Sequence, residues 1–85
     1  MYKVELSIKA KKQLYKLNRI LKHRIVKNLE RIRVRPHAYI KKLVGSPYYS
    51  LRVGDYRIIL DVQDGKLIIF VIELGHRKNI YQRGK

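Results

Sequence analysis

The chain has 85 residues, enough for one domain, and a domain of this size buries only about 60–65% of the surface that its unfolded chain exposes. Lys and Arg number 21 against 6 Asp and Glu, and the net charge of +15 is spread along the whole chain. Such a charge favours a polyanionic partner, either a nucleic acid or an acidic protein, over the alternative of a merely soluble basic surface. The absence of cysteine excludes disulfides, zinc fingers and thiol nucleophiles.

Cofactors and membranes are not expected either. The three histidines, His23, His37 and His76, are scattered and carboxylates are few, so the sequence predicts no metal site. No apolar run approaches the roughly 20 residues that span a bilayer, and the N-terminus lacks the apolar core of a signal peptide. We therefore expect a single cytoplasmic domain over residues 1–85, with no cofactor and no membrane partner.

The first half of the chain predicts one strand and two helices. Residues 2–8 alternate between apolar and polar side chains, as in a half-buried strand. From Ala10 the apolar residues recur at steps of three and four and form one helical stripe. The stripe contains Leu14, Leu17, Leu21, Ile25, Leu29 and Ile32. Asn18-Arg19 is a weak breaker, which favours helices near 9–17 and 19–33, with Ser7 as a cap and Arg35-Pro36 as the end.

The second half predicts a β-meander. Residues 35–48 are loop-like, apart from a short extended piece at 39–43. Strands at 49–53, 56–63 and 66–74 then follow, joined by Gly54-Asp55 and Asp64-Gly65, which are typical of type II′ and type I′ hairpin turns. The last strand is apolar at nearly every position, as expected of a central strand covered on both sides. The predicted fold is α+β: an N-terminal strand, two helices and a three-stranded antiparallel meander, with the helices packed on one face of a single sheet.

Counting from the two turns assigns the meander residues to two faces. The face that the helices should cover carries Leu51, Val53, Ile58, Leu60, Val62, Leu67, Ile69 and Val71. The other face has a basic end and an apolar middle, and it is the natural cleft. This face carries Ser50, Arg52, Arg57, Ile59, Asp61, Ile68, Phe70 and Ile72.

Two arginines stand out in this arrangement. A type II′ turn at Gly54-Asp55 places Arg52 directly opposite Arg57, and like charges opposed across strands are destabilising. A shared phosphate would offset this repulsion, because arginine offers planar bidentate donors that stay charged at any ordinary pH. The alternative is that both side chains are solvated and spread apart.

Further candidates follow the third strand, where His76, Arg77 and Tyr81 should emerge at the same end of the sheet. Neighbouring cations favour a phenolate and lower its pKa, which suits Tyr81 as a general base, although a tyrosine there more often packs or stacks. His76 is either a proton shuttle or a surface histidine that contacts backbone.

Two tyrosines, Tyr48 and Tyr49, lie just ahead of the basic hairpin. Aromatic rings at such a position can stack on the bases of single-stranded RNA, and packing at the sheet edge is the alternative.

The element order, the stretch Gly45-Ser46-Pro47, the motif LRVGDYRI at 51–58 and the motif HRxxxY at 76–81 together resemble the RelE/ParE toxin superfamily. The similarity spans essentially the whole chain and is greatest to the RelE branch, including its archaeal members. The resemblance implies the RelE-like microbial RNase fold and a toxin of a type II toxin-antitoxin system. Such a toxin is a ribosome-dependent endoribonuclease, an mRNA interferase that cleaves the codon in the A site and inhibits translation.

The resemblance also implies a metal-free reaction, in which the 2′-hydroxyl attacks and leaves a 2′,3′-cyclic phosphate. Arg57 and Arg77 match the family's phosphate and transition-state arginines, Tyr81 matches its tyrosine, and Arg52 stands where a second strand lysine is usual. Phosphate and RNA contacts would come from Arg52, Arg57, His76, Lys78 and Tyr49. Ser50 replaces the first strand lysine, so cleavage is expected to be slower, to depend on His76 or Lys78, or to be lost.

As partners, the resemblance implies the ribosome, mRNA and an acidic, partly disordered RelB-like antitoxin, with a two-by-two heterotetramer left open. The antitoxin would add a helix over the helical stripe or over the cleft. Two other functions remain as alternatives. One is a non-enzymatic ParE-like inhibitor of DNA gyrase, and the other is a non-toxic basic protein that binds RNA or the ribosome.

Overall fold

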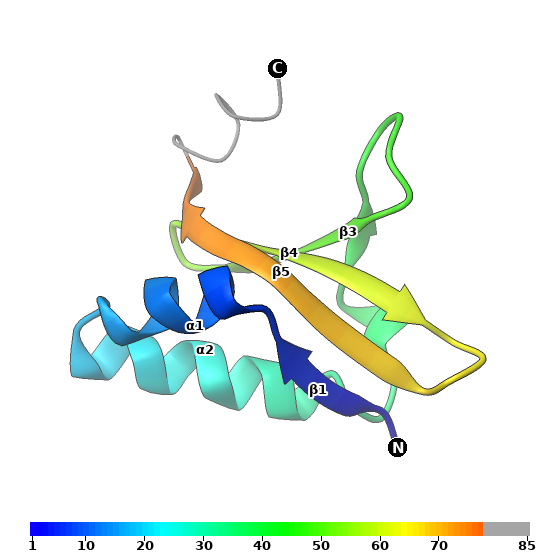
Figure 1. Ribbon diagram of the computed structural model, residues 1–85, viewed down its shortest axis with the longest axis horizontal. Helices are drawn as coiled ribbons and strands as arrows, with labels where there is room; N and C mark the ends of the chain where they lie inside the picture. The colour runs from blue at the N-terminus through cyan, green and yellow to red at the C-terminus, as the bar shows by residue number, and fades with distance from the viewer. Residues whose placement is uncertain (78–85) are drawn as a thin grey trace.

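The computed structural model describes residues 1–77, which form a sheet with two helices against one of its faces (Figure 1). The strand order is β1-β5-β4-β3-β2. The elements are β1 (Lys3–Leu6), α1 (Ile8–Tyr15), α2 (Arg19–Arg31), the 3₁₀ turn η1 (Pro36–Ala38), β2 (Lys41–Lys42), β3 (Tyr49–Val53), β4 (Tyr56–Gln63) and β5 (Ile68–His76). The predicted α+β fold is confirmed.

Both helices begin at polar caps. The hydroxyl of Ser7 accepts a hydrogen bond from the backbone amide of Ala10 at 2.9 Å, and the side-chain oxygen of Asn18 accepts one from Leu21 at 2.9 Å. The division of the helical region at Asn18 is therefore confirmed. No helix in residues 1–77 combines the length and the apolar character needed to cross a membrane.

The core lies between the helices and the sheet. From the helices, Ala10, Ile25 and Leu29 are buried, together with Ile32, the residue that caps the end of α2. From the sheet, the buried partners are Leu51, Val53, Ile58, Leu60, Ile69, Val71 and Leu74. The apolar stripe of the sequence thus packs on the face of the meander that was predicted for it.

Two edge strands extend the meander. β1 pairs in parallel with β5, with Val4 opposite Ile69, and β2 pairs antiparallel with β3. The hydroxyl of Ser7 donates to the carbonyl of Ile72 at 2.6 Å, which fixes the end of β1 to β5. β5 is consequently an interior strand, as its composition suggested, although Phe70 and Ile72 on its second side are only half-buried.

The prediction is confirmed for the first hairpin turn and wrong for the second. Gly54 has φ +58° and the pairing places Arg52 opposite Arg57, so the predicted first turn and its register are confirmed. The second turn is not a two-residue type I′ turn, because residues 64–67 all lie outside the ladder and Gln63 pairs with Ile68. Leu67 sits in this loop at φ +55° and is exposed, so its assignment to the core was wrong.

A β-bulge in β5 changes which side chains reach which face. Leu60 pairs with Val71, but the preceding residue, Ile59, pairs with Glu73, so Ile72 has no partner on β4. Beyond the bulge the alternation reverses, which buries Leu74 in the core. A regular alternation of faces therefore does not continue in β5 after Val71. The alternation of apolar and polar residues in the sequence cannot reveal an inserted residue.

Candidate functional site

Arg52 and Arg57 form a pair on the face of the sheet that lies away from the helices. They are direct partners across β3 and β4, next to the core pair of Leu51 and Ile58, so that alternation turns the arginines outward. Cross-strand partners of this kind have β-carbons about 5 Å apart. The Nε of Arg52 donates to the carbonyl of Gly54 at 3.3 Å, and among residues 1–77 no carboxylate lies within ion-pair distance of Arg52.

A cavity of about 440 Å³ opens on this face beside the arginine pair. Its lining consists of Tyr39, Lys41, Lys42, Leu43, Val44, Ser50, Arg52 and Arg57, and we call it the cleft. The loop between β2 and β3 forms one wall and rises from the sheet on the side opposite the helices (Figure 1). A hydrogen bond of 3.0 Å from the amide of Leu43 to the carbonyl of Tyr48 closes the base of this loop.

The cleft is strongly positive. Four of its lining residues are cations, Lys41, Lys42, Arg52 and Arg57, and no Asp or Glu is among them. A concave surface with one sign of charge concentrates anions, and paired guanidinium groups can hold the oxygens of one phosphate. The described part of this site therefore suits a phosphodiester.

Two of these cations, Lys41 and Lys42, were missed by the sequence reasoning. They lie on β2, a strand of two residues that pairs with β3 at Ser50 and Tyr49. The short extended piece predicted at 39–43 was the available signal, but so short a strand contains too few positions to reveal its register. Only the pairing shows that Lys41 stands directly opposite Ser50.

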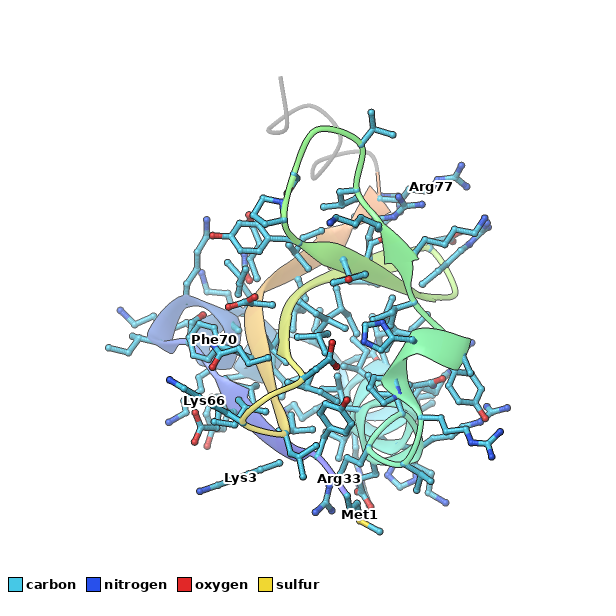
Figure 2. The ribbon with its side chains drawn as sticks, turned by 90° about the vertical axis from the view of Figure 1, so that its right-hand side faces the viewer. Met1, Lys3, Arg33, Lys66, Phe70 and Arg77 are labelled. Carbon is cyan, nitrogen blue, oxygen red and sulfur yellow. The ribbon has the colours of Figure 1, made fainter. Side chains whose placement is uncertain are left out.

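Arg77 lies at the same end of the sheet as the arginine pair. Its backbone amide donates to the carbonyl of Asp55 at 2.8 Å, which holds it next to the turn between β3 and β4. Figure 2 shows Arg77 at the end of β5 away from the turn that carries Lys66. Gly75, opposite Arg57 on β5, adds no side chain that would crowd the guanidinium group.

His76 lies at the expected end of the sheet but on the other face. It pairs with Tyr56, and the two rings meet edge-on with centroids 5.8 Å apart. Both line a hollow formed with α2, which also contains His23 and Arg24. The sequence predicted only the end of the sheet for His76, and the bulge at Ile72 reverses the alternation and turns His76 to the face opposite the arginine pair.

Tyr49 is also placed away from the arginines. It pairs with Leu60, a residue of the buried face, and its ring meets that of His37 edge-on at 5.3 Å. The ammonium of Lys42 lies 5.8 Å above the same ring. The ring that was expected to stack on RNA bases thus contacts side chains of its own chain. Tyr81 and Lys78 lie outside the described residues, and their roles stay predictions.

A polar cluster ties the turn between β4 and β5 to the N-terminus. The hydroxyl of Tyr2 donates to a carboxylate oxygen of Asp64 at 2.6 Å, and Nε2 of His37 donates to the same oxygen at 2.9 Å. The Tyr2 bond, supported by His37, lowers the pKa of Asp64, and the same bond raises the pKa of Tyr2. This cluster is structural, and within residues 1–77 no three His, Asp or Glu side chains are grouped to hold a metal ion.

Comparison with known proteins identifies the family. The model of the ParE toxin of type II toxin-antitoxin systems (parDE) matches residues 4–81. The chain therefore belongs to this family of type II toxins, within the RelE/ParE superfamily predicted from the sequence. No curated protein sequence matches the chain significantly.

Among solved structures the similarity is to RelE. The isolated E. coli RelE toxin superposes with a TM-score of 0.78 at 27% identity, covering 99% of this chain and 95% of that one. A chain of the archaeal RelE-RelB complex from Pyrococcus horikoshii OT3 gives 0.77 at 25% identity, with 89% and 94% covered. A chain of the RelB-RelE complex from Methanococcus jannaschii gives 0.75 at 27% identity, with 95% and 99% covered. The fold is accordingly RelE-like.

Proposed function

We propose that this toxin is a ribosome-dependent endoribonuclease that acts in the cytoplasm and cleaves mRNA in the A site, which stops translation. The observation that carries the proposal is the pair Arg52 and Arg57, opposed across two strands in a cleft whose described lining contains no carboxylate. An RNA phosphate can accept hydrogen bonds from both guanidinium groups at once. It is therefore the substrate group that we assign to the cleft.

In the proposed reaction the 2′-oxygen of one nucleotide attacks the adjacent phosphorus. The P–O2′ bond forms and the P–O5′ bond breaks, so the products are a 2′,3′-cyclic phosphate and a 5′-hydroxyl. Arg52 and Arg57 donate hydrogen bonds to the non-bridging oxygens and stabilise the charge that they gain in the transition state. By family resemblance, Arg77 adds a third cation and Tyr81 takes the proton of the 2′-hydroxyl.

An acidic RelB-like antitoxin is proposed as the partner that neutralises this toxin. The similar structures include antitoxin-toxin complexes of E. coli, Mycobacterium tuberculosis and two archaea. The net charge of +15 favours an acidic chain, and a two-by-two assembly is one form that the complex can take. Ile25 and Leu29 of the helical stripe are already buried by the sheet, so this part of the stripe offers no surface to an antitoxin helix.

The experiment is a translation reaction with purified ribosomes and one defined mRNA, in which the 5′ ends of the fragments are mapped. We expect cuts only when ribosomes are present, and losses of at least about 100-fold in Arg57→Ala and Arg77→Ala, the scale measured when one oxyanion donor is removed. Lys66→Ala, at the far turn of the meander, is the matched control and should cut like the wild type. Equal cutting by all four proteins would show that the site is wrongly assigned.

A ParE-like inhibitor of DNA gyrase is the second candidate, because the matching family model is that of ParE. Inhibition by binding alone needs no opposed arginines in a cleft, so the geometry favours the ribonuclease. The two candidates separate in one comparison. Gyrase trapped on cleaved DNA, together with intact mRNA, would establish the inhibitor and remove the ribonuclease.

A further inference from the structure

We propose that Lys41 is the general acid of this toxin, the group that protonates the 5′-oxygen as it leaves. The inference rests on the proposed ribonuclease function and adds a catalytic residue to it. It follows from one juxtaposition: Lys41 on β2 stands directly opposite Ser50, on the same face of the sheet as Arg52 and Arg57.

The reaction needs a proton that the arginines cannot supply. When the P–O5′ bond breaks, the 5′-oxygen carries negative charge until it is protonated, and a positioned acid contributes typically 10²–10⁴-fold to such a step. A guanidinium group holds its proton too tightly for this role. Among the described residues that line the cleft, only Tyr39, Lys41 and Lys42 carry an ammonium or a phenol that can transfer a proton.

The sheet register distinguishes the two lysines. Lys41 pairs with Ser50, which pairs on its other side with Ile59, so these three positions share the face of the arginine pair. Lys42 pairs with Tyr49, on the opposite face, and its ammonium lies 5.8 Å above the Tyr49 ring. Tyr39 has the guanidinium of Arg31, a residue of α2, 5.1 Å from its ring centroid, so its ring is engaged by a helix residue.

Distances within the sheet put the Lys41 ammonium within reach of the phosphate. A residue directly across a strand lies about 5 Å away and a diagonal one about 7–8 Å, which are the relations of Lys41 to Ser50 and to Arg52. Ser50 is only 8% exposed and its side chain is short, so the stem of Lys41 can pass above it toward the arginine pair. The lysine stem is flexible enough for this path.

The step balances without any further reactant. The P–O2′ bond forms as the 2′-hydroxyl gives its proton to the base. The P–O5′ bond breaks with both of its electrons passing to O5′, and the Lys41 ammonium transfers one proton to that oxygen. The resulting neutral amine regains a proton from water before the next turnover.

The test measures single-turnover cleavage of ribosome-bound mRNA by wild type, Lys41→Ala, Lys41→Arg and the control Lys66→Ala. We expect Lys41→Ala to be about 100-fold slower at saturating ribosome, with the ribosome concentration at half-saturation changed less than threefold, and Lys66→Ala to stay within threefold of the wild-type rate. Lys41→Arg should be as slow as Lys41→Ala, because it keeps the charge but holds its proton. Full activity in Lys41→Arg would overturn the proposal, since it would reduce Lys41 to an electrostatic contact.

A modified mRNA gives an independent readout. When sulfur replaces the 5′-oxygen at the scissile bond, the leaving group no longer needs an acid, so Lys41→Ala should cut this substrate nearly as fast as the wild type does. Arg57→Ala should stay slow on the same substrate, because it lacks a phosphate contact. If the wild type cuts and Lys41→Ala matches Lys66→Ala, the inference about Lys41 fails alone, whereas a wild type that cuts no mRNA overturns the ribonuclease and the inference together.

Discussion

The imidazole of His76 packs edge-on against the ring of Tyr56, with the two planes at 73°, on the helix-covered face of the sheet. The next residue of β4, Arg57, faces the cleft on the other side, opposite Gly75. The bulge at Ile72 causes this separation, because one inserted residue exchanges the faces of every later position in β5. The histidine next to the candidate site in sequence is thus separated from the cleft by the sheet.

This placement predicts a small catalytic role for His76. We expect His76→Ala to cleave ribosome-bound mRNA within threefold of the wild-type rate, since the imidazole lies on the face opposite the arginine pair. Single-turnover cleavage rates of the two proteins check this. A loss as large as that of Arg57→Ala would show that His76 takes part in the chemistry.

Because Arg52 and Arg57 are opposed across the strands, we expect that removing one of them makes the protein more stable and less active. Replacing Arg52 by Thr removes the like-charge repulsion and leaves a good strand residue, so the free energy of unfolding should rise by about 0.5 kcal/mol, within the range of cross-strand pair effects. Cleavage should fall at the same time. Urea unfolding and cleavage assays measure the two effects, with Lys42→Thr as the control because Lys42 faces Tyr49 instead of a cation. A less stable Arg52→Thr would mean that the pair is not strained.

The two turn glycines should respond in opposite ways to alanine. Gly54 has φ +58°, where a side chain is strained, so Gly54→Ala should lower the free energy of unfolding by about 1–2 kcal/mol. A Cβ on Gly65 would meet no atom within 4 Å, and this glycine has no positive φ, so Gly65→Ala should be neutral or stabilise by about 0.4–1 kcal/mol. Urea unfolding of the two variants side by side gives the comparison, and equal destabilisation would contradict the assigned turn geometries.

The Tyr2, Asp64 and His37 cluster predicts a pH-dependent stability. Because the folded state lowers the pKa of Asp64, the stabilisation is present above the ordinary carboxyl pKa of about 3.9 and is lost as the pH falls through the folded-state pKa. Asp64→Asn should therefore unfold more easily than the wild type at pH 7, and the two proteins should converge once the pH has fallen below the folded-state pKa of Asp64. Asp55→Asn, in the other turn of the meander, is the matched control. A difference that persists undiminished in acid would exclude the carboxylate charge as its cause.

The same cluster predicts that the protein loses stability at alkaline pH, through the hydroxyl of Tyr2. The raised pKa of Tyr2 means that its stabilising bond holds below the ordinary tyrosine pKa of about 10 and is lost as the pH rises through the folded-state value. Tyr2→Phe should remove this alkaline loss of stability, which thermal unfolding between pH 8 and 11 measures. An unchanged alkaline profile in Tyr2→Phe would assign the loss to another group.

Local patterns in the sequence were sufficient to predict much of this fold. Hydrophobic spacing located both helices, Asn18 marked the boundary between them, and a glycine at the first turn position set the pairing of Arg52 with Arg57. Each of these features depends on residues that are close together in the chain, so a short sequence pattern is enough to predict it. The arginine pair was predictable for the same reason, since a two-residue turn fixes the register of its neighbours.

The missed features depend on contacts between distant segments. The bulge at Ile72 lies where β5 also pairs with β1, and the Ser7 hydroxyl bonds to the bulged residue's own carbonyl, 65 positions along the chain. The four-residue loop at 64–67 is bound to Tyr2 and His37 through Asp64. Lys41 enters the cleft only because β2 pairs with Ser50. The apolar and polar pattern of a single strand contains no information about any of these distant partners.

The most direct test is a structure of the ribosome-bound toxin with an mRNA whose attacking nucleotide lacks the 2′-hydroxyl, so that the bond stays intact. We expect the scissile phosphate in the cleft, with its non-bridging oxygens within hydrogen-bond distance of Arg52 and Arg57, and with the Lys41 ammonium next to the 5′-oxygen. An mRNA seated instead on the helical face, near His76 and Arg24, would contradict it.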